Sequence, residues 1–223
     1  MKKYAVIVAG GSGQRMGAQV PKQFLLLKGK PLLWYTLQTF LQTFPDIQVI
    51  LVLPAAHIGE GEHLVQSLEH NNRITLVAGG ATRFHSVQNG LGLVKEEAIV
   101  FVHDGVRCLV TADLLQRCYE QALVKGSAIP AVTATDSIRV VTHEGSVVAD
   151  RNTIRIVQTP QTFKTTLLLP AFEQVYTEAF TDEATVVEAM GNPICLIEGE
   201  HTNIKITRPV DLLIAEKIVE ERG

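Results

Sequence analysis

The sequence predicts an α/β fold, with a Rossmann-like, mostly parallel sheet covered by helices on both faces. Short apolar runs of strand length alternate with segments whose apolar residues recur at helical spacing. The first apolar run, 5–9, also leads directly into a glycine-rich loop, as strands do when they deliver a binding loop to one edge of such a sheet. At 223 residues the chain is expected to form a single domain, 1–223.

Each element rests on its own pattern. The expected strands are the apolar runs 5–9, 47–53, 74–78, 98–102, 127–132 and 194–197. The expected helices are 32–44, which stops before Pro45, then 57–70, 83–95, 111–125 capped by Thr111, 165–179, one opening at Thr181 as N-cap, and 210–222. Residues 98–102 are the most hydrophobic run and are expected to be central. Lys205 lies in a short Ile-flanked strand, where a cation requires a nearby anion.

Residues 136–161 break the alternation of strands and helices. Two stretches of alternating pattern surround His143-Glu144-Gly145, with no helical period, which indicates an inserted β-hairpin. Its β-branched residues have no covering helix, so another surface must bury them. A second copy of the chain is the simplest partner, and 136–161 is therefore expected to be a protruding β-arm.

Composition excludes several function classes. A net charge of −3 gives no general attraction to nucleic acid or to acidic membranes. The longest apolar runs are strand-sized, so no membrane span is expected. Met1-Lys2-Lys3 and the run after them imitate a signal peptide, but the run ends too soon at Gly10, which favours a cytoplasmic protein. The three cysteines are far apart and form no Cys-x-x-Cys pair, which argues against zinc and disulfides.

The first glycine-rich loop has the composition of a polyanion site. Glycines let backbone N–H groups approach phosphate oxygens, and Arg15 and Lys22 add two cations. Met16 occupies the position where a dinucleotide fingerprint needs Gly or Ala, which argues against NAD. No P-loop motif is present, because Gly29-Lys30 is followed by Pro31. An ordinary glycine-rich surface turn is the alternative.

Two further positions are expected at the same edge. Asp104 follows the central strand, where a carboxylate can hold Mg²⁺ against phosphate oxygens; the alternative is an Asp that only caps a turn. Gly79-Gly80 precedes a helix whose N–H groups, with the Ser86 hydroxyl, can accept a flat polar ligand edge; the alternative is a plain turn. His103 is expected to be structural.

Motifs along nearly the whole chain resemble those of one family. They are Ala9-Gly10-Gly11-x-Gly13-x-Arg15-Met16-Gly17, Pro21-Lys22-Gln23, Gly-Gly before Ser86, His103-Asp104-x-x-Arg107, Asp150-Arg151, Thr159-Pro160-Gln161, Thr181-Asp182-Glu183-Ala184 and Asn203-Ile204-Lys205-Ile206-Thr207. In this order they resemble the 2-C-methyl-D-erythritol 4-phosphate cytidylyltransferase family of the non-mevalonate isoprenoid pathway. The resemblance implies a nucleotidyltransferase domain of the nucleotide-diphospho-sugar transferase type. It also implies transfer of CMP from CTP to the polyol phosphate, giving 4-diphosphocytidyl-2-C-methyl-D-erythritol and pyrophosphate.

The resemblance also implies roles for individual residues. The catalytic cations are Arg15, Lys22, Arg151 and Lys205. CTP is bound by Ala9, Gly10, Gly11, Ser12, Gly13, Arg15, Lys22, Gly80, Ala81, Ser86 and Asp104, the last also holding Mg²⁺ or another divalent cation. The polyol phosphate contacts Gly105, Arg107, Arg151, Thr159, Thr181 and Lys205, and the arm clasps a partner in a homodimer that supplies Arg151. Three positions depart from the family pattern: Ala81 is usually acidic, Gly105 is usually Ala and Cys108 is usually Pro.

The chemistry needs no general base, since the attacking phosphate monoester has a second pKa of about 6 and is already anionic. The obstacle is the repulsion between two anions, which fixed cations overcome. Ribitol 5-phosphate cytidylyltransferase shares nearly all these motifs and is the nearest alternative. A non-catalytic CTP-binding regulator is an alternative of another class, although it would not need Arg151 and Lys205.

Overall fold

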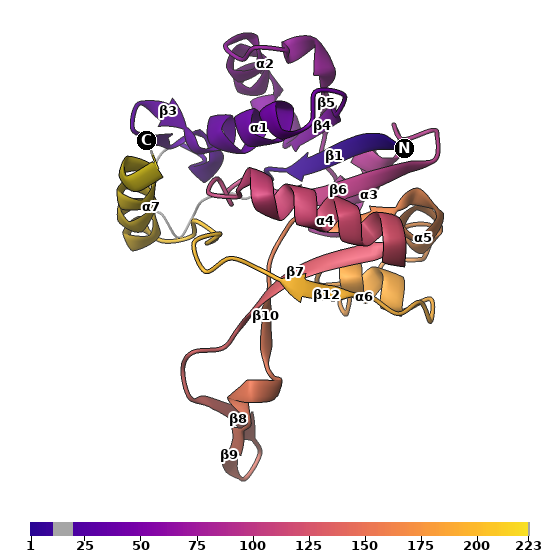
Figure 1. The fold of residues 1–223 in the computed structure, drawn as a ribbon, viewed down its shortest axis with the longest axis vertical. Coiled ribbons are helices and arrows are strands. Elements are labelled where there is room, and N and C mark those ends of the chain that lie inside the picture. The colour runs from indigo at the N-terminus through magenta and orange to yellow at the C-terminus, as the bar shows by residue number, and fades with distance from the viewer. Residues whose placement is uncertain (11–19, 223) are drawn as a thin grey trace.

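The structure is a computed structural model that describes residues 1–10 and 20–222. Within them, an eight-stranded sheet of order β10-β7-β11-β6-β1-β4-β5, with β12 also paired to β7, forms the centre of the molecule (Figure 1). The strands are β1 (Lys2–Val8), β4 (Gln48–Leu53), β5 (Ile74–Ala78), β6 (Ala98–Asp104), β7 (Ser127–Thr133), β10 (Arg155–Val157), β11 (Gln161–Lys164) and β12 (Leu196–Glu198). The neighbours β6, β1, β4 and β5 are all parallel, which confirms the mostly parallel sheet.

Helices pack on both faces because side chains alternate along each strand. Ala5 and Ile7 of β1 face a core formed with α1 (Leu32–Thr43), α2 (Ile58–Gln66) and α4 (Ala112–Lys125). Val6 faces the other core, formed with α3 (Arg83–Leu91), α5 (Thr165–Ala171) and α6 (Glu183–Glu188). The last helix, α7 (Pro209–Arg222), packs against α1 through a third, smaller cluster.

Short elements connect these layers. Two small strands, β2 (Leu26–Leu27) and β3 (Lys30–Pro31), pair with each other before α1. The 3₁₀ turns are η2 (Lys22–Phe24), η3 (Ala55–His57), η4 (Asn71–Arg73) and η5 (Arg151–Thr153). In the part of the chain that the structure describes, no helix is both long enough and apolar enough to cross a membrane.

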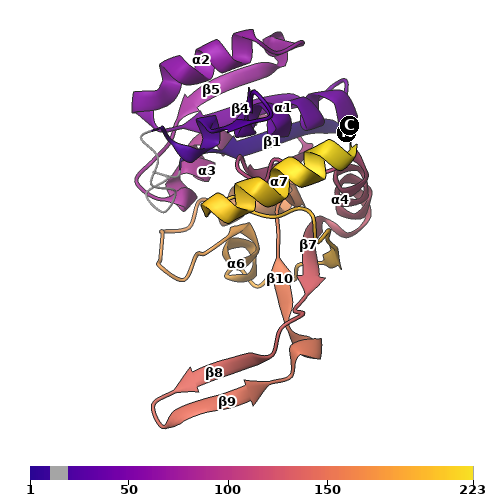
Figure 2. The same ribbon diagram turned by 90° about the vertical axis from the view of Figure 1, so that its left-hand side faces the viewer.

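The inserted hairpin is present but shorter than 136–161. Strands β8 (Ile138–Thr142) and β9 (Gly145–Ala149) pair only with each other and project from the body (Figure 2). The returning chain rejoins the central sheet, where β10 pairs with β7 and β11 lies antiparallel between β6 and β7. Residues 155–157 and Gln161 therefore belong to the sheet, because they lie in strands that pair with β7 and β6.

Several predicted boundaries are wrong, each for a local reason. The helix α3 ends at Leu91 rather than at 95, with Gly92 as its C-cap, and α5 ends at Ala171 rather than at 179. The N-cap of α6 is Asp182 and not Thr181: its carboxylate accepts the Thr185 N–H at 2.9 Å, and Thr185 Oγ1 accepts the Asp182 N–H in return. The predicted strand around Lys205 forms no strand ladder. Thr111 caps α4 as expected.

Candidate active site

The site lies where the order of the strands reverses. From β1 the chain proceeds outward to β4 and β5, and then returns to place β6 on the other side of β1. The loops after these parallel strands share one edge, and a crevice at such a switch point is where open α/β sheets bind ligands. A pocket of about 490 Å³ is found there. Its wall includes the predicted residues Ala9, Gly10, Lys22, Gly80, Ala81, Ser86, Asp104 and Lys205.

Gly11, Ser12, Gly13 and Arg15 lie outside the described residues. Among the predicted residues that the structure describes, Arg151 and Thr181 do not lie in this pocket wall. Arg151 begins η5 at the base of the arm, where its side chain is exposed and donates to the Thr135 carbonyl at 2.9 Å. Thr181 is exposed just before α6. Within one chain, therefore, the structure does not bring Arg151 to the pocket.

Asp104 is the carboxylate around which the pocket's cations gather. Its Oδ2 lies 2.9 Å from Lys205 Nζ and 3.6 Å from Arg107 Nε, and its Oδ1 lies 3.3 Å from Arg83 Nε. Burial would raise the pKa of Asp104, but Arg83 and Lys205, followed by Arg107, outweigh burial and hold this pKa far below its usual range. The carboxylate is therefore ionised, and the three cations around it outnumber its charge.

Lys205 reaches Asp104 from an irregular segment. A backbone hydrogen bond ties this segment to the loop after β6, joining the Ile206 N–H to the Val106 carbonyl at 3.1 Å. Ile206 is fully buried, whereas Lys205 next to it is partly exposed toward the pocket. The buried isoleucine thus fixes the segment, and the anion that a lysine here requires is Asp104.

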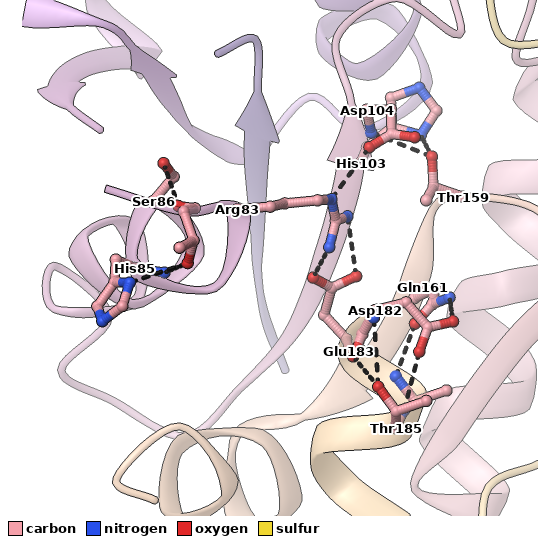
Figure 3. Close-up of polar contacts among 12 residues, drawn as sticks. Arg83, His85, Ser86, His103, Asp104, Thr159, Gln161, Asp182, Glu183 and Thr185 are labelled. Atoms are coloured by element: carbon pink, nitrogen blue, oxygen red, sulfur yellow. Dashed lines mark hydrogen bonds and ion pairs between the residues drawn. The ribbon is translucent and has the colours of Figure 1, made fainter. Parts of the chain in front are cut away.

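Thr159 holds the backbone N–H of Asp104 and is itself hydrogen-bonded to His103 (Figure 3). Thr159 Oγ1 accepts the Asp104 N–H at 3.0 Å and lies 3.0 Å from His103 Nδ1. Because a carbonyl oxygen can only accept, His103 Nε2 donates to the Arg107 carbonyl at 3.2 Å, and Nδ1 of the neutral ring therefore accepts the Thr159 O–H. Complete burial lowers the pKa of His103 to about 4, so the ring is neutral as this arrangement requires.

This network gives Thr159 and Gly105 structural roles besides the substrate contacts expected of them. The Thr159 hydroxyl is buried, both donates and accepts within the protein and is not part of the pocket wall, so it supports Asp104. The Gly105 N–H, expected to contact substrate, donates to the Val8 carbonyl at 2.9 Å, and its carbonyl accepts from Thr36 Oγ1. Both backbone groups of Gly105 are therefore used by the fold. Arg107, besides its contact with Asp104, donates to the Asn203 carbonyl at 2.9 Å.

The second glycine turn is built by close packing at the start of α3. A Cβ at Gly80 would lie 2.4 Å from His85 Cβ and 3.0 Å from the His85 carbonyl carbon, so no larger residue fits without movement. The Gly80 N–H donates to Ser86 Oγ at 3.1 Å, and Ser86 donates to the Thr82 carbonyl at 2.9 Å. The turn is thus held rigidly against the pocket, with Ala81 in its wall.

Two charged residues of the site received no role from the sequence. Arg83 lines the pocket, and its two terminal nitrogens bind both carboxylate oxygens of Glu183. One signal could have found Arg83: it is the first residue of α3, where the helix dipole disfavours a cation unless an anion is near. No local pattern distinguishes Glu183, since acidic residues are common in a first helical turn.

Comparison with known proteins decides the family. The family model described as IspD, 2-C-methyl-D-erythritol 4-phosphate cytidylyltransferase, matches residues 4–221. The chain belongs to this family. Members are cytidylyltransferases, so the chain is an enzyme of the nucleotidyltransferase kind.

Individual relatives of the IspD family match over their full length. The 2-C-methyl-D-erythritol 4-phosphate cytidylyltransferase of Phocaeicola vulgatus is 45% identical over 219 residues, covering 98% of this chain and 100% of that protein. The enzyme of the same name from Bacteroides fragilis is 44% identical with the same coverage. The crystal structure of the Thermus thermophilus enzyme is 33% identical, covers 99% of this chain and 100% of its own, and superposes with a TM-score of 0.77.

Proposed function

We propose that this chain transfers CMP from CTP to 2-C-methyl-D-erythritol 4-phosphate, producing 4-diphosphocytidyl-2-C-methyl-D-erythritol and pyrophosphate. The observation that carries the proposal is the cluster of Arg83, Arg107 and Lys205 around Asp104 at the switch-point pocket. Membership of the IspD family supports the choice of nucleotide and acceptor. The reaction takes place in the cytoplasm under this proposal, since the apolar run after Met1 ends too soon at Gly10 to be a signal peptide.

The chemistry follows from the charges of the pocket. An acceptor phosphate oxygen attacks the α-phosphorus of CTP, and the leaving group is pyrophosphate. Because the acceptor is already anionic near neutral pH, no side chain has to remove a proton. The pocket must instead offset repulsion between anions, and fixed cations do so without reorganisation at the moment of reaction. Lys22 and Arg15 are assigned to the triphosphate, and Lys205 to the acceptor phosphate.

A divalent cation fits Asp104 if phosphates supply most of its ligands. Mg²⁺ is commonly bound by one or two carboxylates together with substrate phosphates and water. In residues 1–10 and 20–222 no cluster of three or more metal-ligating side chains exists, so the protein alone offers no closed cage. Asp104 would hold the ion in place of one of its present cationic neighbours. When bound, the ion would neutralise phosphate charge.

The arm is proposed to join two copies of the chain and to carry Arg151 into the partner's pocket. Val141 is 83% exposed and Val148 is 74% exposed, and the two lie on one face of the β8–β9 pair. An isolated two-stranded hairpin is marginally stable in water, so these apolar side chains require a covering surface. A second copy supplies one and explains why Arg151 lies apart from the pocket of its own chain.

The function is tested by incubating the protein with CTP and Mg²⁺, separately with 2-C-methyl-D-erythritol 4-phosphate, with ribitol 5-phosphate and without acceptor. Product mass and released pyrophosphate are measured. We expect product only with the first acceptor, while ribitol-linked product would assign the alternative acceptor. CTP binding without product in all three incubations would indicate a regulator.

Lys205→Met should lower turnover by roughly a hundredfold or more, and Lys217→Met on exposed α7 is the matched control.

The homodimer is tested by light scattering of the paired variant Val141→Asp/Val148→Asp. We expect a monomer, because two buried charges without partners would oppose association. Val175→Asp, at a valine that is 88% exposed and outside the arm, is the control and should leave the dimer intact. A wild-type monomer, or a dimer in the paired variant, would contradict the proposed interface.

A further inference from the structure

Arg83, which lines the pocket, is held by a carboxylate from a different helix. It begins α3, whereas Glu183 begins α6, a hundred residues later. The guanidinium binds Glu183 with both terminal nitrogens, one of them at 3.1 Å, and its Nε lies 3.3 Å from Asp104 Oδ1 (Figure 3). One arginine thus bridges two carboxylates, which lie on the same side of Figure 3 while Arg83 reaches them from α3 on the other side.

The anchor of this bridge is rigid. Glu183 is 1% exposed, and the first turn of α6 is fastened to β11 by Gln161. Gln161 Oε1 accepts the Ala184 N–H at 2.8 Å, and Gln161 Nε2 donates to Asp182 Oδ2 at 2.8 Å. Because β11 is paired with β6, the strand that ends in Asp104, both ends of the bridge rest on adjacent strands.

Stability alone is a weak reason to keep this pair. Burying a carboxylate and a guanidinium costs desolvation, and apolar residues of similar volume often serve the fold equally well. Burial raises the pKa of Glu183, and Arg83 opposes that rise. The pair therefore contributes geometry: it fixes the direction in which Arg83 presents Nε to the pocket.

We infer that Glu183 is a positioning residue that acts through Arg83 to set the orientation of Asp104, an inference that rests on the proposed function. With Oδ1 of Asp104 directed at Arg83, Oδ2 is directed at Lys205, 2.9 Å away. Without Glu183, the guanidinium is free to follow an incoming phosphate, and Asp104 loses its fixed orientation. Substrates would still bind through the other groups of the pocket, but they would meet in poorer alignment.

The test compares Glu183→Gln with Glu188→Gln, the same substitution at an exposed position of the same helix. Turnover, both KM values and the melting temperature are measured on the full chain. We expect kcat of Glu183→Gln to fall by about tenfold to a hundredfold, since small misplacements of reacting groups have effects of this size. Each KM should change by less than about threefold, and Glu188→Gln should match wild type within about twofold.

A double-mutant cycle separates positioning from a general structural effect. If Glu183 acts through Asp104, adding Glu183→Gln to Asp104→Asn should not lower kcat further. The inference would be overturned if the losses of kcat in the two single variants multiply in the double variant, or if Glu183→Gln has the same kcat as Glu188→Gln. Should Glu183→Gln fail to fold, the double variant Arg83→Met/Glu183→Leu replaces it. We expect this variant to have a near-native melting temperature and the same loss of kcat. A native kcat in this variant would refute the positioning role of Glu183.

Failure of the proposed function would give different results from failure of this inference. If wild type and Glu188→Gln both make no product with either acceptor, the function fails and the inference falls with it. An active wild type beside an unimpaired Glu183→Gln overturns the inference and leaves the function intact.

Discussion

Replacing Thr159 by valine should destabilise the protein, because the hydroxyl satisfies two buried groups. Valine has nearly the same shape but leaves the Asp104 N–H without an acceptor and His103 Nδ1 without a donor. Each unsatisfied buried group costs about 1–3 kcal/mol, so the loss of both should lower the free energy of unfolding by about 2–6 kcal/mol. For a chain of this length that corresponds to a decrease in melting temperature of about 4–24 °C.

Calorimetry and steady-state kinetics together test this prediction. The matched control is Thr75→Val, at an exposed position of β5 away from the pocket, which should change the free energy of unfolding by less than about 0.5 kcal/mol. Because Thr159 supports Asp104 and does not face the pocket, kcat should fall more than the KM for the polyol phosphate rises. A variant with native melting temperature and a raised acceptor KM alone would refute the reasoning, and would return Thr159 to the substrate-contact role that the resemblance implied.

Two further predictions concern the same edge of the sheet. Gly80→Ala should weaken CTP binding by about tenfold or more, measured by calorimetry without acceptor, because its Cβ would overlap His85 and the turn would have to shift; Gly59→Ala, in open space on α2, is the control and should bind normally. His103 has a pKa of about 4 through burial, so the unfolded chain binds more protons between pH 4 and 6.5 and stability falls as the pH decreases. The free energy of unfolding, measured with urea, should fall by about 2 kcal/mol between pH 6.5 and 5 because of this residue. An equal decrease in His103→Gln would contradict the assignment of this pH dependence to His103.

The place of the site was predictable because it depends on the direction of strands. Ala9 and Gly80 lie just after strands of the parallel set and Asp104 ends one, and the carboxyl ends of parallel strands share an edge whatever the details of packing. Apolar runs located those strands correctly, so the residues after them fell at the pocket. Apolar runs of strand length were sufficient to predict this part of the fold.

The extent of the arm was not predictable from the same patterns. Strand β11 has four residues, and nothing in Gln161–Lys164 alone indicates that they insert between β6 and β7 in the antiparallel direction. Pairing is decided by partners elsewhere in the chain, which a local pattern does not contain. For the same reason β10, with three exposed residues, was assigned to the hairpin rather than to the sheet.

Hydrogen bonds in the structure show which groups of Gly105 and Thr159 the fold itself uses. Gly105 and Thr159 match motif positions that suggest substrate contacts, yet their polar groups are bound to Val8, Thr36, Asp104 and His103. Each buried donor and acceptor needs a partner, and only coordinates identify which one it has. A residue type at a motif position therefore limits what a side chain can do without stating which atoms it meets.

Arg83 shows that a local sequence pattern can indicate the need for an anion without identifying which residue supplies it. A cation at the first residue of a helix is unfavourable by itself, so the sequence already implies a nearby anion. It does not say that this anion is Glu183, or that a second one, Asp104, shares the same guanidinium. Lys205 shows the same limit, since its position among isoleucines implied an anion that proved to be Asp104. Arg83 and Lys205 each require an anion, and both contact the same carboxylate, Asp104. This shared contact brings residues of separate motifs into one site that is able to bring two phosphates together.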